Sequence, residues 1–561
     1  MERELFALSP DVRLRKENFG GLVFNKRTGD TLDVDREGFR LLTLLKENEK
    51  LSKEEIQAGF FEFSTKVNPE SISRLLGELE KEGFVVSLKG LSPKKREESL
   101  NLILEESWPD FQPLRAPETV HWAVTYRCEK ECPDCYVRRH QQEFKELSKE
   151  EAFKVIDKLA EWGVFQLAIG GGEPLLYDNL PDVVEYAHSR GLVVHITTGI
   201  DNIGINSLEE LSEGLTSLQL GVKPWNLLHR KTSQKKKLNR FVEMTKEFGL
   251  QAEANLILSQ TTLENFEEIM SHLARADFDR VVLLRYKPPA DISQWEQEKP
   301  SAKDLLGLEE KLTKLSSKYD LNLRVDCALG FLQRKLESKK ALARGIRGCT
   351  AGRRIAVLAP DGSLFPCSQL VSSDLKLGNL LSKSPEVIWK ESELLKDYRF
   401  FRKKGKFKKS ICHFCEAVEH CGGCRVFSSD GKGADPNCPQ PEVLFLEQLD
   451  KTGRKAELRE YFKENSSISV EKYMERYGVG RKCATKELEQ IRWLSEASNC
   501  FPGARGSTRY YRWIEEAIND VQDTIGYTSG GVPFATREQI SDWIEEDDNR
   551  SYPEWLRENN Q

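Results

Sequence analysis

Between residues 118 and 345 the chain alternates short apolar segments with amphipathic helical segments, and this alternation limits the fold more than any other feature. The apolar segments are unbroken, which is typical of strands buried on both faces of a parallel sheet. Six of them precede helical stretches: 122–124, 166–169, 192–197, 218–222, 252–258 and 280–284. Six such units are too few to close an eight-stranded barrel. We therefore predict an α/β fold whose core, residues 117–345, is a partial (β/α)6 TIM barrel.

Other patterns flank this predicted barrel. Residues 1–90 contain three strand patterns, at 12–15, 21–24 and 31–34, followed by three helical patterns ending with 71–82, which predicts a winged-helix-like α+β module. Residues 91–116 are charged and contain prolines, as a linker does. Residues 346–445 are rich in loops and cysteines. The pattern of residues 446–515 predicts a C-terminal helical, winged-helix-like region, and residues 516–561 form an acidic tail.

The thirteen cysteines of the 561-residue chain are grouped rather than scattered. Three lie at Cys128, Cys132 and Cys135, and eight more fall between Cys327 and Cys438. The charged N-terminus lacks an apolar signal region and no stretch is apolar enough to cross a bilayer, so we expect a cytoplasmic protein. In a reducing compartment such grouping indicates metal ligation rather than disulfides. A net charge of −6 gives no reason to expect broad nucleic-acid binding.

The first cysteine group follows a predicted strand with the spacing C-x3-C-x2-C. Three thiolates on one loop suit a four-iron cluster whose fourth iron is open to a small molecule. A zinc site is the alternative, and His140 would be its ready fourth ligand. One strand–helix unit later, at the end of the next strand, the chain reads Gly-Gly-Gly-Glu-Pro over 170–174. Glycines allow close backbone approach, and Glu173 can accept hydrogen bonds from an ammonium group.

This pairing resembles the radical S-adenosylmethionine (SAM) superfamily, whose cysteine loop has the same spacing and whose Gly-Gly-Glu turn holds the SAM amino group. The resemblance implies that Cys128, Cys132 and Cys135 bind a [4Fe-4S] cluster. It also implies that Gly171, Gly172 and Glu173 hold the methionyl end of SAM. The expected chemistry is reductive cleavage of SAM to a 5′-deoxyadenosyl radical, with electrons from a donor such as flavodoxin or ferredoxin. No catalytic acid or base is identifiable.

The chain departs from the family pattern at three places. Asp134 stands before the last loop cysteine, where the family often has an aromatic residue. Gly221-Val222-Lys223 occupies the strand where many relatives have Ser-x-Asp, and Thr198 stands where asparagine is common. We therefore assign no residue to the ribose.

The second cysteine group resembles the SPASM extension of radical SAM enzymes, which houses two auxiliary [4Fe-4S] clusters. Two zinc ribbons are the alternative. The spacing between Cys421 and Cys424 is two residues, where the family more commonly has three. The resemblance implies an outer cluster and an inner cluster that lacks one ligand, for which Cys327 is the candidate. The implied ligands are Cys412, Cys415, Cys421 and Cys438 for the outer cluster, and Cys349, Cys367 and Cys424 for the inner one.

The module at 1–90 resembles the precursor-peptide recognition element related to the pyrroloquinoline-quinone chaperone (PqqD-like). By this resemblance a leader peptide would add a strand beside 31–34 and pack against the helix at 71–82. A winged helix used for dimerisation or DNA binding is the alternative. We thus expect a radical SAM/SPASM enzyme that modifies a ribosomally made peptide or protein, with no membrane or nucleic-acid partner.

Two other functions stay open. One is a radical SAM enzyme acting on a small haem or quinone precursor. The other is a cluster-containing DNA-binding regulator, suggested by Arg481, Lys482 and Lys486 in the C-terminal region.

Overall fold

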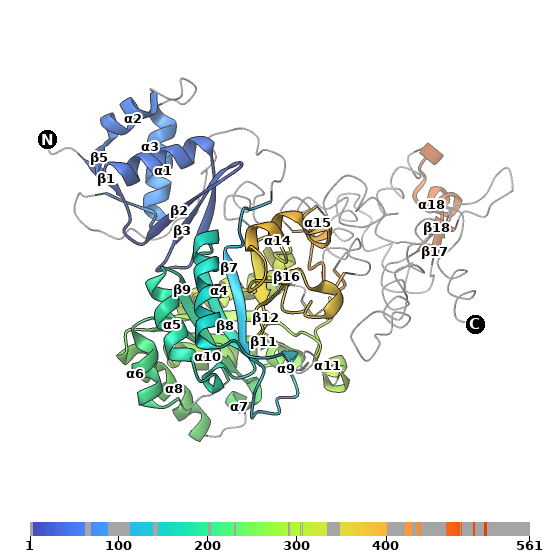
Figure 1. The fold of residues 1–561 in the computed structure, drawn as a ribbon. Helices are drawn as coiled ribbons and strands as arrows, with labels where there is room; N and C mark the ends of the chain where they lie inside the picture. Colours follow the sequence, from blue (N-terminus) through green and yellow to red (C-terminus); the bar gives the residue numbers. More distant parts are fainter. Residues whose placement is uncertain are drawn as a thin grey trace.

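The structure is a computed structural model with three recognisable parts: an N-terminal domain, a barrel and a smaller C-terminal region (Figure 1). It describes residues 4–61, 69–87, 113–137, 144–199, 203–228, 232–289, 292–333 without 303 and 306, 348–400, 421–428, 435–438, 467–484 without 483, 498–499 and 510–512.

The core is a ten-stranded sheet in the order β13-β12-β11-β10-β9-β8-β7-β14-β15-β16. Seven parallel strands follow chain order: β7 (Thr119–Thr125), β8 (Gln166–Gly171), β9 (Val193–Thr198), β10 (Ser217–Val222), β11 (Gln251–Leu258), β12 (Arg280–Arg285) and β13 (Leu323–Val325). The six predicted strands are all present, and β13 extends the series. On the other side β14 (Ile355–Leu358) joins β7 in parallel, and the antiparallel strands β15 (Ser363–Phe365) and β16 (Gly378–Asn379) follow.

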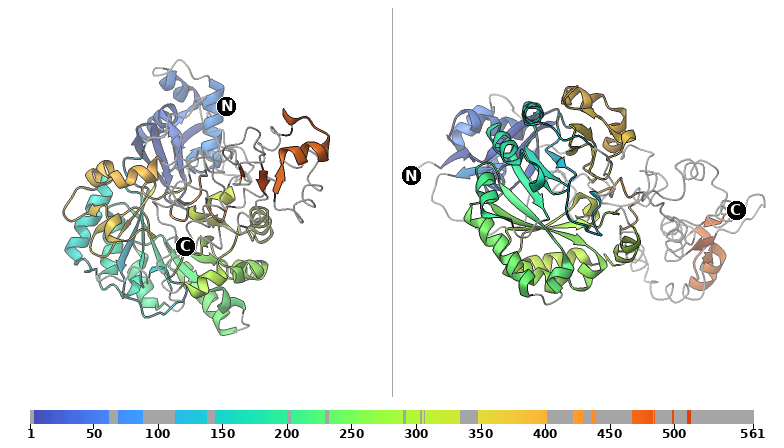
Figure 2. Two further views of the ribbon diagram at one scale, coloured as in Figure 1. Left: turned by 90° about the vertical axis from the view of Figure 1, so that its right-hand side faces the viewer. Right: turned by 60° about the horizontal axis from the view of Figure 1, so that its bottom comes forward.

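Helices cover the outside of the curved sheet (Figure 2). The main ones are α4 (Lys149–Trp162), α5 (Leu180–Ser189), α6 (Ile205–Ser212), α8 (Thr232–Glu247), α10 (Phe266–Arg275) and α12 (Leu308–Tyr319). Helix α4 illustrates how local sequence sets their ends. Ser148 and Glu151 form a reciprocal capping box at its start, and Gly163 ends it in the left-handed region with φ of 95°. The predicted partial-barrel architecture is therefore confirmed for the core.

The two faces of the parallel sheet differ in burial. Side chains such as Leu167, Ile196 and Leu218 lie in the apolar core beneath the helices. The alternate positions carry mostly polar side chains that face the barrel interior, some half-buried, such as Thr197 and Gln219, and some buried, such as His195. Because side chains alternate along a strand, one face builds the core and the other lines an accessible interior.

The N-terminal domain contains the predicted three strands followed by three helices. Its elements are β1 (Leu5–Leu8), β2 (Val12–Glu17), β3 (Gly20–Asn25), β4 (Thr31–Asp35), α1 (Arg36–Glu47), β5 (Leu51–Ser52), α2 (Lys53–Phe61), α3 (Pro69–Lys81) and β6 (Val85–Ser87). The sheet order is β2-β3-β4, and a second sheet, β5-β1-β6, was not predicted. Asp35 caps α1, accepting a hydrogen bond from the Gly38 amide at 2.6 Å.

The sheet β2-β3-β4 is covered on both faces, because it packs against its own helices and against the barrel. Val23 lies in the core under the helices, whereas Leu22 and Phe24 point the other way. The Phe24 ring stacks on Phe165 of the barrel with centroids 4.9 Å apart. This alternation explains why every residue of β3 is buried.

Buried ionic groups join the N-terminal domain to the barrel. Arg354, just before β14, donates to both carboxylate oxygens of Asp33 at 2.8 and 3.2 Å and also pairs with Glu118. Arg15 donates to the carbonyls of Ala116 at 2.8 Å and Gly163 at 2.7 Å. Breaking a buried pair leaves an uncompensated charge, at a cost of about 3–5 kcal/mol. These contacts hold the domain firmly against the barrel.

The predicted linker at 91–116 is described only from residue 113. That part is packed: Leu114 is buried, and its carbonyl accepts a hydrogen bond from Trp389 Nε1 at 2.8 Å. The end of the linker therefore belongs to the interface between the domain and the barrel.

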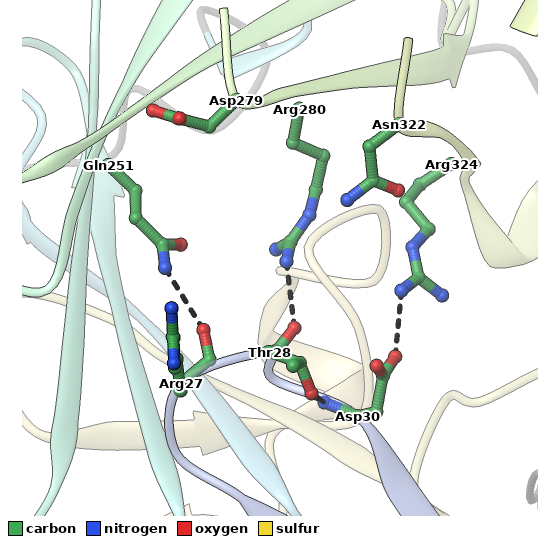
Figure 3. A pocket seen from close by; sticks show the side chains of 8 residues that line it. All are labelled: Arg27, Thr28, Asp30, Gln251, Asp279, Arg280, Asn322 and Arg324. Atoms are coloured by element: carbon green, nitrogen blue, oxygen red, sulfur yellow. Dashed lines mark hydrogen bonds and ion pairs between the residues drawn. The ribbon is translucent and has the colours of Figure 1, made fainter. Parts of the chain in front are cut away.

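A polar pocket lies where the turn before β4 meets the starts of the barrel strands (Figure 3). Gln251 donates to the Arg27 carbonyl at 3.0 Å, and Arg280 to the Thr28 carbonyl at 2.7 Å. Arg324 pairs with Asp30 at 2.8 Å. The pocket is at the opposite end of the strands from the cysteine loop.

The remaining described elements are α14 (Pro385–Glu391) and α15 (Glu393–Arg399) beside the barrel, and β17 (Ser467–Ser469), α18 (Val470–Tyr477), β18 (Ser498–Asn499) and β19 (Tyr510–Arg512) farther along. The last three strands form a sheet in the order β17-β19-β18. Helix α18 lies within the helical region predicted at 446–515, whereas much of that region and the acidic tail at 516–561 lie outside the described residues. In the part of the chain that is described, no helix has the length and apolarity needed to span a bilayer.

Candidate active site

The loop with the first three cysteines follows β7 at the carboxyl end of the parallel sheet. Cys128 is exposed, while Cys132 and Cys135 are half-buried. The Cys135 amide donates to the Cys132 carbonyl at 3.2 Å, which makes the second half of the loop a tight turn. The thiols are thus close in sequence and accessible, as a cluster with an open iron site requires.

The Gly-Gly-Glu turn at the end of β8 is hydrogen bonded to the start of this loop. The Gly172 amide donates to the Thr125 carbonyl and the Glu173 amide to the Arg127 carbonyl, both at 2.8 Å. A Cβ atom on Gly171 or Gly172 would lie 2.2 Å from one of those same two carbonyl oxygens. Only glycine at these two positions allows the turn to approach the loop so closely. The glycines of the Gly-Gly-Glu turn are therefore the reason why this turn can lie directly against the cysteine loop.

The carboxylate of Glu173 is buried and held in one orientation. Its Oε1 accepts hydrogen bonds from Thr198 Oγ1 at 2.8 Å and from the Leu175 amide at 3.3 Å. Its Oε2 accepts from the Gly199 amide at 3.0 Å. A carboxylate has about four acceptor positions, so capacity remains for an ammonium group. Thr198, one of the departures from the family pattern, is therefore the side chain that, together with two backbone amides, orients Glu173.

Polar side chains line the barrel interior below this turn. Gln219 accepts hydrogen bonds from Thr197 at 2.8 Å and Asn255 at 3.1 Å, and donates to Glu253 at 3.0 Å. His195 is buried near them, and burial lowers its pKa to about 4. The imidazole is therefore neutral at physiological pH.

Two further departures from the family pattern contact each other. Lys223, which follows β10, donates to both carboxylate oxygens of Asp134 in the cysteine loop. Sequence reasoning could not pair them, because 89 residues separate them along the chain.

Four cysteines of the second group lie close together beside the barrel. The thiols of Cys349 and Cys424 are hydrogen bonded to each other. Burial raises the pKa of the Cys327 thiol, and the nearby charges of Asp326, Cys424 and Cys367 raise it further. The pKa of Cys367 is also raised, mainly by burial. Thus the structure brings Cys327, the candidate fourth ligand, into the neighbourhood of the three predicted ligands of the inner cluster.

Basic residues at the end of β12 connect the barrel to this quartet. Asp435 Oδ2 accepts hydrogen bonds from Arg285 at 2.6 Å and from the Cys424 amide at 3.0 Å. Lys287 Nζ lies 3.6 Å from Asp326, and 5.1 Å from the ring centroid of Tyr136, which adjoins the cysteine loop. Neither Arg285 nor Lys287 was predicted from the sequence, because lysine and arginine are common at the ends of strands.

For the outer cluster, the described residues include Cys421, which is buried, and the half-buried Cys438. Cys412 and Cys415 lie outside the described residues, as does His140. Among the described side chains, no three Cys, His, Asp or Glu residues converge on a site for a single metal ion. The grouped thiols nevertheless suit iron–sulfur clusters, because each cysteine of such a cluster binds a different iron.

Comparison with known proteins matches both halves of this arrangement. Residues 122–273 match the radical SAM superfamily, and residues 349–421 match the iron–sulfur cluster-binding SPASM domain. The mycofactocin maturase MftC of Mycolicibacterium smegmatis is 25% identical over 344 residues, which cover 58% of this chain and 83% of the relative. The PqqA peptide cyclase of Bradyrhizobium diazoefficiens is 26% identical over 366 residues, which cover 61% of this chain and 92% of the relative.

The name of a third relative refers to haem rather than to a peptide. The AdoMet-dependent heme synthase of Oleidesulfovibrio alaskensis is 23% identical over 367 residues, which cover 61% of this chain and 90% of the relative. Among solved structures, Streptococcus suis SuiB bound to S-adenosylmethionine has a TM-score of 0.54 at 20% identity, covering 75% of this chain and 96% of that one. SuiB bound to its precursor peptide SuiA has a TM-score of 0.55 at 18% identity, covering 78% of this chain and all of that one. These likenesses show a shared fold.

The protein is a radical SAM enzyme. More particularly, it carries a SPASM domain behind the radical SAM barrel, and its cofactors are SAM and iron–sulfur clusters.

Proposed function

We propose that this enzyme modifies a ribosomally made precursor peptide, captured through its N-terminal domain. The observation that carries the proposal is the adjacency of the cysteine loop and the Glu173 turn, on a chain that also carries a domain with an edge strand. Two curated relatives are named as a peptide maturase and a peptide cyclase, which supports a peptide substrate here as well.

In this proposal Cys128, Cys132 and Cys135 hold the cluster that binds SAM, and Glu173 holds the SAM ammonium. When bound, these groups supply a 5′-deoxyadenosyl radical that abstracts a hydrogen atom. The chain itself contributes orientation and exclusion of water. Thr198 and the Gly199 amide fix the carboxylate, and the glycines keep the turn against the loop.

The auxiliary cysteines complete the proposed cofactor set. The inner cluster takes Cys327, Cys349, Cys367 and Cys424, and the outer cluster takes Cys412, Cys415, Cys421 and Cys438. Reducing equivalents come from a flavodoxin or ferredoxin type of donor. A chain whose function needs this many reduced thiols belongs in the cytoplasm.

The proposed leader site is the outer edge of β4. This strand ends the sheet order β2-β3-β4, so the described strands leave its second edge open to strand addition. The Asn25 amide donates to the Asp30 carbonyl. Since hydrogen-bonded and non-bonded pairs alternate in an antiparallel sheet, Thr31 directs its main-chain groups toward the outer edge. These features support a PqqD-like role for the domain.

The buried contacts of the domain change how such a leader would act. A flexible tether would raise only the local concentration of the peptide. Here Arg354 and Arg15 anchor the domain, so a bound leader would also have a fixed position relative to the barrel.

The test is conversion of a candidate precursor encoded beside this gene, followed by mass spectrometry. Reconstituted enzyme, SAM and dithionite are incubated with the full precursor or with its leaderless core. We expect a mass change that needs SAM and is at least tenfold faster with the leader. Equal conversion of both peptides would reject leader capture, and unchanged peptides would reject the peptide substrate.

One relative named as a heme synthase favours a tetrapyrrole substrate as the second candidate. Coupled SAM cleavage with a tetrapyrrole precursor, and none with the peptide, would establish that alternative.

A further inference from the structure

The cysteine loop is anchored by an ion pair at a point where this chain differs from the radical SAM pattern. Lys223 Nζ donates to Asp134 Oδ2 at 2.6 Å and Oδ1 at 2.8 Å. Asp134 lies between Cys132 and Cys135, and its side chain is only 5% exposed. Lys223 is 24% exposed, so the pair is partly buried, and its two hydrogen bonds to one carboxylate make it stronger than ordinary surface pairs, whose contribution is close to zero.

The burial of Asp134 contrasts with its surroundings. Glu129, Lys130, Glu131 and Pro133 of the same loop are exposed, so apolar packing does little to hold this stretch. Lys223 comes from the end of β10, a rigid strand in the middle of the parallel sheet. The pair therefore connects an exposed loop to the scaffold.

A second lysine reaches the other side of Cys135. The ammonium of Lys287, after β12, lies 5.1 Å from the Tyr136 ring centroid, within the range of a cation–π contact. Cys135 thus has a contact to a strand-end lysine through each of its sequence neighbours.

We propose that Lys223 is a positioning residue, which anchors the cysteine loop through Asp134 and balances the Asp134 carboxylate beside the cluster. The proposal rests on the assignment of Cys128, Cys132 and Cys135 as cluster ligands. It extends that assignment to two residues that the family pattern does not contain.

The charges give this role a signature that a purely structural contact lacks. Net charge near an iron–sulfur cluster helps to set its reduction potential. Removing the ammonium (Lys223→Met) leaves the carboxylate unbalanced, so the midpoint potential falls. Removing the carboxylate charge (Asp134→Asn) leaves the ammonium unbalanced, so the potential rises. The double variant restores neutrality and returns the potential to the wild-type value.

The first experiment measures hydrogen exchange of residues 126–137 in the metal-free protein. A hydrogen bond to a charged group contributes about 1.5–3 kcal/mol, so exchange in all three variants should be roughly 10- to 100-fold faster. Lys246→Met is the matched control, because Lys246 pairs with Asp277 at 2.8 Å on the outside of the barrel. If residues 126–137 exchanged at the wild-type rate in Lys223→Met, the proposed anchoring of the loop would be wrong.

The second experiment is a redox titration that measures the midpoint potential of one cluster. This cluster is identified by an electron paramagnetic resonance signal that changes when SAM is added. Opposite shifts in the two single variants support the charge balance, and shifts of the same sign overturn it. If the triple alanine variant at Cys128, Cys132 and Cys135 kept the SAM-responsive signal, the ligand assignment itself would be wrong. Hydrogen exchange in the metal-free protein would still decide whether the anchor exists.

Discussion

Arg285 and Asp435 form a buried ion pair, 2.6 Å between Nη1 and Oδ2, that joins strand β12 to the loop of Cys424. The same carboxylate oxygen accepts the Cys424 amide at 3.0 Å. One arginine of the barrel thereby determines where a proposed ligand of the inner auxiliary cluster lies.

Replacing Arg285 with methionine should destabilise this auxiliary site. It leaves the buried Asp435 carboxylate without a counter-ion, which costs about 3–5 kcal/mol. We expect the loss of about four irons per chain, the content of one cluster, with the SAM-responsive signal retained. Iron analysis after anaerobic reconstitution measures the loss. Arg324→Met, which breaks a half-exposed pair at the other end of the barrel, is the control. Full iron content in Arg285→Met would contradict the prediction.

Glu173→Gln should weaken SAM binding without changing the iron content. The amide keeps the shape of the carboxylate but loses its charge, and such hydrogen bonds contribute about 1.5–3 kcal/mol. The dissociation constant for SAM should rise roughly 10- to 100-fold. Thr198→Val, which removes only the hydroxyl that orients Glu173, should raise it several-fold. Equilibrium dialysis with labelled SAM gives both values, and unchanged binding in Glu173→Gln would exclude its role.

Alanine at Cys128, Cys132 and Cys135 together should remove one cluster and all SAM cleavage. The auxiliary thiols come from separate segments, so their clusters should remain. The readouts are iron content and 5′-deoxyadenosine formation by chromatography. Continued formation of 5′-deoxyadenosine would place the SAM-binding cluster elsewhere.

Thr31→Pro should block leader binding at the edge of β4. Proline cannot donate a main-chain hydrogen bond, and it is tolerated at a sheet edge. The Thr31 side chain also bonds Glu118, so Thr31→Val serves as the control that loses only this contact. Fluorescence polarisation of a labelled leader should show at least tenfold weaker binding for the proline variant alone. Equal affinity in all three proteins would move the leader site away from β4.

Acid should destabilise the barrel partly through His195. Its pKa is about 4 in the folded chain, against 6.5 ordinarily, so the unfolded chain binds more protons between these values. The contribution of His195 to stability is therefore constant well above the unfolded pKa of 6.5 and is lost as the pH drops toward 4, with a loss of about 1.4 kcal/mol at pH 5.5. His195→Gln should show a smaller loss of melting temperature between pH 7.5 and 5.5. His188→Gln, at an exposed position on α5, should match the wild type. An unchanged loss in His195→Gln would refute this account.

The sequence patterns predicted the barrel strands well, because unbroken apolar runs between helices leave few alternatives. They also brought the two cofactor motifs together, since consecutive parallel strands end at the same edge of a sheet. Strands β5 and β6 were missed, because two or three residues are too few to form a pattern. The Asp134–Lys223 contact could not be predicted for another reason. It depends on how distant segments are placed in the tertiary structure, which the local spacing of residues does not encode.

The two-sided burial of the sheet β2-β3-β4 has a consequence for exchanging the N-terminal domain between enzymes. Its outer face carries Asp33 and Phe24, whose partners Arg354 and Phe165 belong to the barrel. A chimaera that exchanged residues 1–87 with a relative would set foreign side chains against a buried arginine. A transplanted domain would pack against the barrel only if it supplied matching partners for Arg354 and Phe165. The matching surface of the barrel would have to be exchanged together with the domain.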